Sequence, residues 1–239
     1  MERALWPSLW GMSALAWLTL AGSEFGLIAP GLCSSLALYS PVRSARAIGA
    51  AMQLNSFAQL AASWLLMLAA MTPPLLGRPL AYIWNRSLAR RRGRAMLSFI
   101  GGYFVVWLVA GGPLLALALV LLIVCGRGPS AVIVCVALAL FWQGTPAKQT
   151  CLNFCHRVAR LSAFGMTADL DCLRFGVTTG LWCVGSCWAW MLVPLLAPWH
   201  MFAMALVAAI MLLERLVLPR RPAWGIRWPE LRINTAALS

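Results

Sequence analysis

Charged residues are scarce in this sequence. They make up 10% of the 239 residues, and only 6 are Asp or Glu. Soluble globular proteins carry roughly 25% charged residues, so this composition excludes a soluble domain. Hydrophobic residues account for 62% of the chain, and the mean hydropathy is +0.82. The sequence therefore predicts an integral membrane protein.

Familiar catalytic motifs are also missing. The sequence contains no glycine-rich phosphate loop, no HExxH helix and no serine nucleophile elbow. We therefore expect a protein that is not an enzyme. Internal repeats and low-complexity segments are absent as well, which argues against a transporter built from inverted repeats.

Long apolar runs dominate the chain. A helix needs roughly 17 to 25 apolar residues to cross the hydrocarbon core. Six stretches meet this requirement: 10–32, 52–72, 96–124, 129–145, 173–196 and 199–217. The sequence predicts an all-α, polytopic bundle over residues 1–219 and a short basic tail over 220–239.

Two of these runs allow a second interpretation. Gly111-Gly112-Pro113 interrupts the third, which is either one kinked span or a span followed by a half-helix. The first follows Arg3 and resembles a signal peptide. Because its apolar character continues to Cys33, a retained span is favoured.

The basic residues are distributed unevenly between the predicted loops. Short loops rich in Lys and Arg remain cytoplasmic during insertion. With six spans, both termini are then cytoplasmic, and the expected location is the bacterial inner membrane. The run Arg90–Arg94 is interpreted as a topology determinant that contacts anionic lipid, not as a nucleic-acid site. One side of the membrane would carry Arg3, Arg78, Arg86, Arg90, Arg91, Arg92, Arg94, Lys148, Arg157, Arg160, Arg220, Arg221, Arg227 and Arg232, whereas the other would carry Arg43, Arg46 and Arg127.

Five of the 8 cysteines occur in a helical pattern. Cys151 and Cys155 are four residues apart after the fourth span, and Cys183 and Cys187 are four apart within the fifth. Residues with this spacing share a helix face, and Cys172 lies close to the same azimuth as the second pair. Paired thiols in a reducing compartment favour metal ligation over disulfides.

The face that carries Cys183 also contains small residues. Gly176 and Gly180 follow a small-xxx-small pattern that lets another helix approach closely. With Trp190, this stripe should face the protein interior. Cys33, Cys125 and Cys135 lack such a pattern and are interpreted as small apolar fillers.

Soft ligands also occur on the second predicted span. Met67 and Met71 are four residues apart and lie near its cytoplasmic end, where Cys151, Cys155 and Cys172 are also expected. Thiolates and thioethers together select Cu(I), whereas four thiolates, or thiolates with imidazole, suit Zn²⁺. Copper is the expected metal, and zinc remains the alternative. Both methionines could equally serve as core packing.

Four further residues are weaker ligand candidates. His156 follows Cys155, and His200 opens the last span on the outer side, where an aromatic-belt role is the alternative. Glu24 and Glu214 lie within predicted spans, where an ionisable group normally has a partner or a function. Glu214 could pair with Arg215 instead.

Several segments together resemble a known family. These are residues 64–73 (WLLMLAAMTP), 144–155 (GTPAKQTCLNFC), 176–191 (GVTTGLWCVGSCWAWM) and Glu214-Arg215. They are similar to a bacterial family of metal-binding integral membrane proteins, some described as copper chaperones, and the similarity extends over about residues 50–220. The family commonly has adjacent cysteines before the tryptophan. Here Ser186 occupies the first of those positions.

Three functions follow from these patterns. The first is a membrane protein that binds Cu(I) for copper handling or cuproenzyme maturation, with membrane lipids and a cuproenzyme as partners. The second is an accessory or scaffold subunit that packs its small-residue stripe against another membrane protein. The third is a transporter for the metal ion itself.

Overall fold

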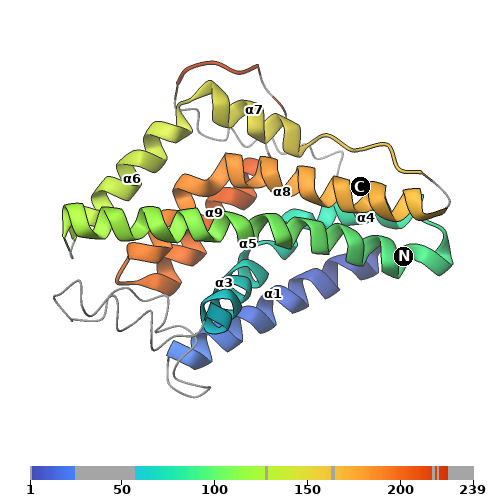
Figure 1. Cartoon of the computed structure of the whole chain (residues 1–239), viewed down its shortest axis with the longest axis horizontal. Coiled ribbons are helices and arrows are strands. Elements are labelled where there is room, and N and C mark those ends of the chain that lie inside the picture. Colours follow the sequence, from blue (N-terminus) through green and yellow to red (C-terminus); the bar gives the residue numbers. More distant parts are fainter. Residues whose placement is uncertain are drawn as a thin grey trace.

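The computed structural model describes residues 2–24, 57–126, 129–162, 165–216, 219 and 221–225. Every element within these ranges is a helix, which confirms the all-α prediction. Figure 1 shows long α5 and α8 crossing the molecule, with the other helices around them. The elements are α1 (Glu2–Glu24), α3 (Phe57–Met71), η1 (Pro73–Leu76), α4 (Gly77–Arg86), η2 (Ala89–Arg91), α5 (Arg92–Cys125), α6 (Pro129–Gln143), α7 (Pro146–Cys155), α8 (Gly165–Leu196) and α9 (His200–Leu216).

Two of the described helices are long and apolar enough to cross a membrane. They cover Ala89–Cys125 and Gly165–Leu196. Helices α6 and α7 form a third candidate, a bent pair that could be one broken span. The predicted stretches 10–32 and 52–72 reach beyond the described residues at 25–32 and 52–56, as does Cys33.

The predicted third span is one continuous helix. Its buried residues recur every three or four positions on both sides of Pro113, at Trp107, Gly111, Leu114 and Ala118. A single buried stripe therefore passes through the proline. The structure therefore agrees with the first interpretation, because this segment is one long helix without a separate half-helix.

Helices α5 and α8 run parallel and make the most extensive contact among the described helices. A Cβ atom added to Gly176 would meet the Phe99 carbonyl oxygen of α5. One turn later, a Cβ added to Gly180 would lie 3.2 Å from the Tyr103 carbonyl oxygen. The two glycines permit this backbone approach, as their spacing predicts. The stripe that carries Cys183 is consequently buried inside the bundle.

The fourth predicted span ends in a sharp bend. Helices α6 and α7 meet at an angle of 73° across Gly144 and Thr145. Thr145 caps α7 by accepting a hydrogen bond from the Lys148 amide at 3.3 Å, and Pro146 occupies the first turn. As a result, Cys151 and Cys155 lie on a helix that packs along α8, not in an open loop.

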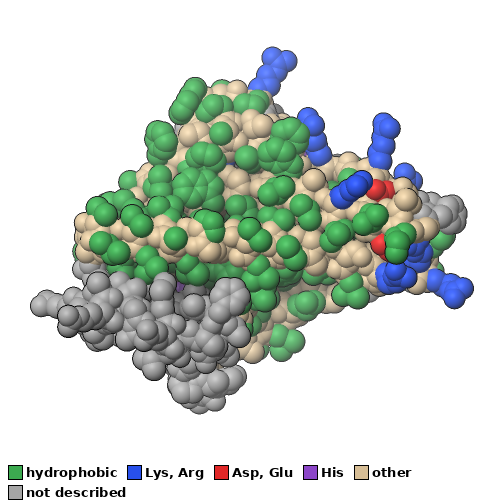
Figure 2. All heavy atoms as spheres, viewed as in Figure 1, with side chains coloured by type: hydrophobic (Ala, Val, Ile, Leu, Met, Phe, Trp, Pro, Cys, Tyr) green, Lys and Arg blue, Asp and Glu red, His purple; other side chains and the backbone are tan. Residues whose placement is uncertain are grey.

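Most of the described basic side chains that are visible in Figure 2 gather at one end of the molecule, where α4 and the starts of α5 and α8 lie in Figure 1. There Asp169 forms ion pairs of 2.8 Å with both Arg91 and Arg94. Lys148 does not lie in an exposed loop, where the sequence predicted it. It is only 3% exposed and lies within the bundle.

Candidate metal centre

Cys183 lies at the centre of a buried thiol cluster between α5, α7, α8 and α9. Its Sγ is 3.2 Å from the hydroxyl oxygen of Tyr103 on α5, and both residues are at most 1% exposed. One turn along α8, the Cys187 thiol donates a hydrogen bond of 2.9 Å to the Cys183 carbonyl. The four-residue spacing thus places both thiols on one inward face, as the sequence predicts.

The bend before α7 brings the other cysteine pair to the same level of α8. The Cys155 thiol lies within hydrogen-bonding reach of Ser186 and interacts electrostatically with Cys183. The Cys151 Sγ is 2.8 Å from where a Cβ of residue Gly185 would lie, so a larger residue at this position would displace the Cys151 side chain. Four cysteines from two helices therefore surround one short segment of α8.

The indole of Trp142 fixes this arrangement. Its Nε1 donates a hydrogen bond of 3.0 Å to the Gly185 carbonyl. Its ring packs edge to face against Trp188, with centroids 5.4 Å apart. The end of α6 is therefore held on α8 directly before the chain turns into α7.

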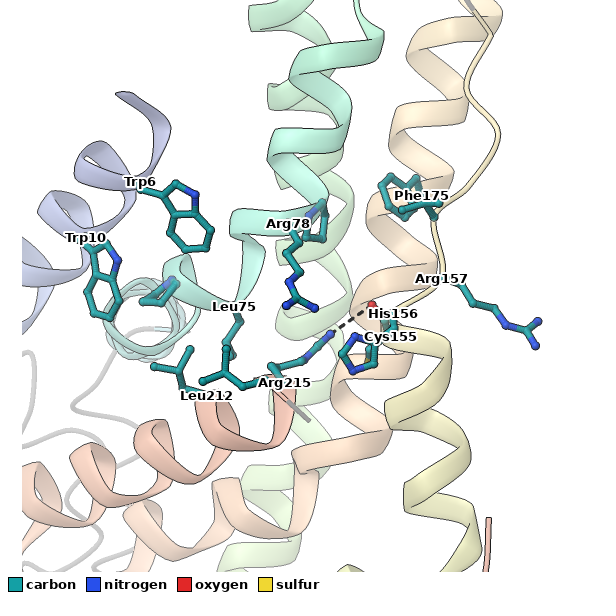
Figure 3. Close-up of a pocket in the computed structure, with 14 residues that line it drawn as sticks. Trp6, Trp10, Leu75, Arg78, Cys155, His156, Arg157, Phe175, Leu212 and Arg215 are labelled. Carbon is teal, nitrogen blue, oxygen red and sulfur yellow. Dashed lines mark hydrogen bonds between the residues drawn. The ribbon is translucent and has the colours of Figure 1, made fainter. Parts of the chain in front are cut away.

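Arg215, in the last turn of α9, supplies positive charge to the cluster. Its guanidinium donates a hydrogen bond of 3.4 Å to the Cys155 carbonyl (Figure 3). It also lies within hydrogen-bonding reach of the Cys183 thiol. A cation in this position would stabilise a thiolate at Cys183 over a thiol. A charged group buried among apolar helices requires such a partner.

A buried polar network connects α7 to α9 beside the cluster. The Lys148 ammonium forms a 2.6 Å ion pair with Glu214, and their side chains are 4% and 8% exposed. Gln143 accepts from Lys148 and donates to Glu214 at 2.7 Å. Trp190 donates to the Gln143 oxygen at 3.1 Å. Glu214 therefore pairs with Lys148, not with its neighbour Arg215, and is occupied by this network.

A cavity of about 350 Å³ reaches Cys155 from the surface. His156 lines it beside Arg215, and its Nε2 is buried with no hydrogen-bond partner among the described residues. Burial, together with the positive charges of Arg215 and Arg78, lowers the pKa of His156 to about 4. The imidazole is therefore neutral at pH 7, the state in which histidine can bind a metal.

Other predicted ligands lie apart from this cluster. Cys172 is buried on the same face of α8 but lies eleven residues before Cys183, about 16 Å along the helix axis. It borders a small cavity with Arg91 and Asp169 at the basic end. The expectation that Cys151 and Cys155 lie at the same end as Cys172 is wrong, because the bend before α7 carries both to the level of Gly185.

Met67 and Met71 are fully or almost fully buried on α3. This helix packs against α5 and α9, which supply Tyr103 and Arg215 to the cluster. The methionines therefore lie on a helix adjacent to the thiol site. Their role as ligands stays a prediction.

His200 does not join the cluster. His200 begins α9, about 22 Å along the axis from Arg215, and its Nδ1 is 2.8 Å from the Pro194 carbonyl oxygen. Its Nε2 is buried without a partner among the described residues. Glu24 ends α1, and its side chain lies outside the described part of the chain.

The cluster has fewer converging ligands than a closed metal site. Among the described residues, no three His, Cys, Asp or Glu side chains are arranged to hold a metal ion. The seven described cysteines are free thiols. The geometry thus offers neighbouring thiols with a cation beside them, and not a preformed site of four ligands.

Sequence reasoning missed Tyr103 and the part played by Arg215. The available signal for Tyr103 was its hydroxyl group within the apolar stretch 96–124. The chain contains only 3 tyrosines. Arg215 was visible only as a possible partner of Glu214. The residues that each one contacts come from distant parts of the sequence.

Residues 61–228 match the family described as "PpoB2: Copper chaperone". This match covers more than half of the chain, so the protein belongs to this copper-chaperone family, and the resemblance of its motifs is confirmed. Neither a curated protein nor a solved structure matches the chain.

Proposed function

We propose that this member of the copper-chaperone family binds Cu(I) at Cys183 together with one of the two neighbouring thiols, Cys187 or Cys155, and passes it on during cuproenzyme maturation. The observation that carries the proposal is the convergence of both thiols on Cys183 beside the guanidinium of Arg215. The family description supports copper as the cargo.

The number and softness of the ligands favour Cu(I) over zinc. Structural zinc sites use four ligands in a tetrahedral arrangement. No group of three or more potential His, Cys, Asp or Glu ligands occurs among the described residues. Cu(I) prefers soft thiolates and accepts a pair of them, which the cluster provides.

Charge balance explains the position of Arg215. Two thiolates around one Cu(I) leave a net charge of −1, which is costly to bury in a membrane bundle. The guanidinium interacts with both Cys183 and Cys155, so it would neutralise this charge. Glu214 would not compete for Arg215, because Lys148 already pairs with it at 2.6 Å.

The proposed topology is a multi-pass protein of the bacterial inner membrane, with six spans and both termini in the cytoplasm. The basic side chains at one end of the molecule support a cytoplasmic face there (Figure 2). The parallel course of α5 and α8 also fits, because α6 and α7 between them would return the chain across the bilayer as one broken span.

We propose a non-catalytic chaperone role over a scaffold role. The scaffold hypothesis relied on the small-residue stripe as a surface for another membrane protein. Gly176 and Gly180 already pack against Phe99 and Tyr103 of α5 within the same chain. This stripe is therefore already buried by packing within the chain.

Metal analysis of the purified protein tests the proposal. We expect the protein, prepared in detergent under reducing conditions and supplied with Cu(I), to retain copper in preference to zinc. Cys183→Ser/Cys187→Ser should lose that copper. Cys125→Ser/Cys135→Ser removes the same number of thiols elsewhere and should retain it. Equal copper content in both variants would refute the assignment.

A further inference from the structure

The cavity beside Cys155 has an unusual distribution of charge. Arg78, Arg157 and Arg215 line it together with His156, whereas none of its fourteen lining residues is acidic (Figure 3). Arg78 and Arg215 both act electrostatically on His156, so all three groups lie close to one another. Two neighbouring guanidinium groups without a carboxylate favour binding of an anion.

The opposite wall of the cavity is apolar. Trp6 and Trp10 of α1 contribute it together with Leu75 and Leu212 (Figure 3). Trp6 is held close to α4, since a Cβ atom on Gly77 would lie 2.5 Å from its ring. A volume of about 350 Å³ with a cationic wall and an aromatic wall suits a small organic anion.

Cys155 connects this cavity to the thiol cluster. It lines the cavity, and its thiol also interacts with Cys183 and Ser186 in the bundle interior. A ligand held by Arg78 and Arg215 would therefore lie next to the first thiol of the proposed copper site. The cavity is thus an opening through which the Cys155 thiol can be reached.

We propose that the cavity receives Cu(I) as a complex with a small thiol that carries carboxylates. This inference rests on the proposed copper-binding function and names the form in which the copper arrives. Arg78 and Arg215 bind the carboxylates of the carrier, and the indoles of Trp6 and Trp10 cover its apolar part.

The transfer is a ligand exchange without a redox change. A Cu–S bond to Cys155 forms while the Cu–S bond to the carrier breaks, and copper stays Cu(I) throughout. The proton of the Cys155 thiol moves to the departing carrier thiolate, so the carrier leaves as a neutral thiol group. A second exchange of the same kind moves the ion from Cys155 to Cys183.

The test compares two carriers that differ only in their carboxylates. Cu(I) is supplied to the detergent-purified protein as its complex with glutathione or with glutathione diethyl ester, and the rate of copper transfer is measured. We expect Arg78→Gln to slow transfer from glutathione by roughly three- to tenfold and to leave transfer from the diester unchanged. Arg86→Gln, at the other end of α4, is the matched control and should change neither rate.

The outcomes separate this inference from the proposed function. If Arg78→Gln slows both carriers equally, or neither, the inference is overturned while copper binding stands. If no copper transfers from either carrier although the protein retains Cu(I) supplied directly, the inference is overturned, whereas a protein that retains no Cu(I) from any source refutes the proposed function. Binding of metal-free S-methylglutathione by calorimetry then decides whether the cavity is a site for such anions, and this binding should be lost in Arg78→Gln. A tightly held anionic phospholipid that S-methylglutathione does not displace would also overturn the inference.

Discussion

The bundle contains two groups of cysteines that differ in their surroundings. Cys135 on α6 is fully buried, and the titratable neighbour that acts on its thiol is Cys125. Cys183 is equally buried, yet a tyrosine hydroxyl, a guanidinium and two further thiols act on it. Burial alone therefore does not mark a metal site. A metal site is marked instead by polar groups that converge from several helices.

The largest effect on the thiol cluster should come from a variant that releases α7 from α9. Lys148→Met would leave Glu214 buried without its partner, at a cost of about 3 to 5 kcal/mol of folding free energy. We expect α7 to loosen and Cys155 to separate from Cys183. The rate of maleimide labelling at Cys155, followed by mass spectrometry, should rise, whereas the rate at Cys135 should not.

The double variant Lys148→Met/Glu214→Met is the control for this prediction. It removes both charges and should restore slow labelling of Cys155, since no unpaired charge remains buried. Faster labelling of Cys155 and Cys135 alike in the single variant would indicate general unfolding and contradict the prediction.

Removal of the positive charge of Arg215 should leave the thiol cluster without a cation beside it, like the Cys125 and Cys135 pair. Arg215→Met deprives the bound copper complex of its countercharge, and we expect Cu(I) affinity to fall by about 10- to 100-fold. Competition with a chromogenic Cu(I) chelator measures this change. Arg215→Lys keeps the charge and should lose less affinity, whereas unchanged affinity in Arg215→Met would contradict the role.

The smallest expected effect concerns the hydroxyl of Tyr103. Tyr103→Phe preserves ring packing against α8 but removes the group 3.2 Å from Cys183 Sγ. A hydrogen bond of this kind contributes about 0.5 to 1.5 kcal/mol, so Cu(I) affinity should fall roughly two- to tenfold. The same chelator competition applies.

Tyr82→Phe provides a matched control for that change. Its hydroxyl donates to the Ala159 carbonyl at 2.9 Å, outside the thiol cluster. Its loss should leave copper affinity unchanged. Equal losses from both tyrosine variants would show that the effect is not specific to the cluster.

The sequence predicted the inward face of α8 correctly. Cys183 and Cys187 share that face because they are four residues apart, and Gly176 and Gly180 lie beside them because small residues recur with the same spacing. These relations lie within one helix. Helical periodicity is therefore enough to derive them.

The positions of Cys151 and Cys155 could not be derived in this way. Their spacing predicted a shared face, but the level at which they meet α8 depends on the 73° bend after Gln143. The sequence contains the cap and the proline that permit a new helix there, but not the direction in which it packs. That direction is fixed by contacts such as Trp142 with Gly185.

The sequence by itself determined the all-helical class of the protein, the inward face of α8 and the family, because hydropathy, residue spacing and motifs are properties of short segments. Only the tertiary structure separated Cys172 from the other thiols and paired Lys148 with Glu214. It also placed Tyr103 and Arg215 beside Cys183. These contacts join residues up to 112 positions apart on different helices (Tyr103 and Arg215), and their geometry depends on how the helices pack.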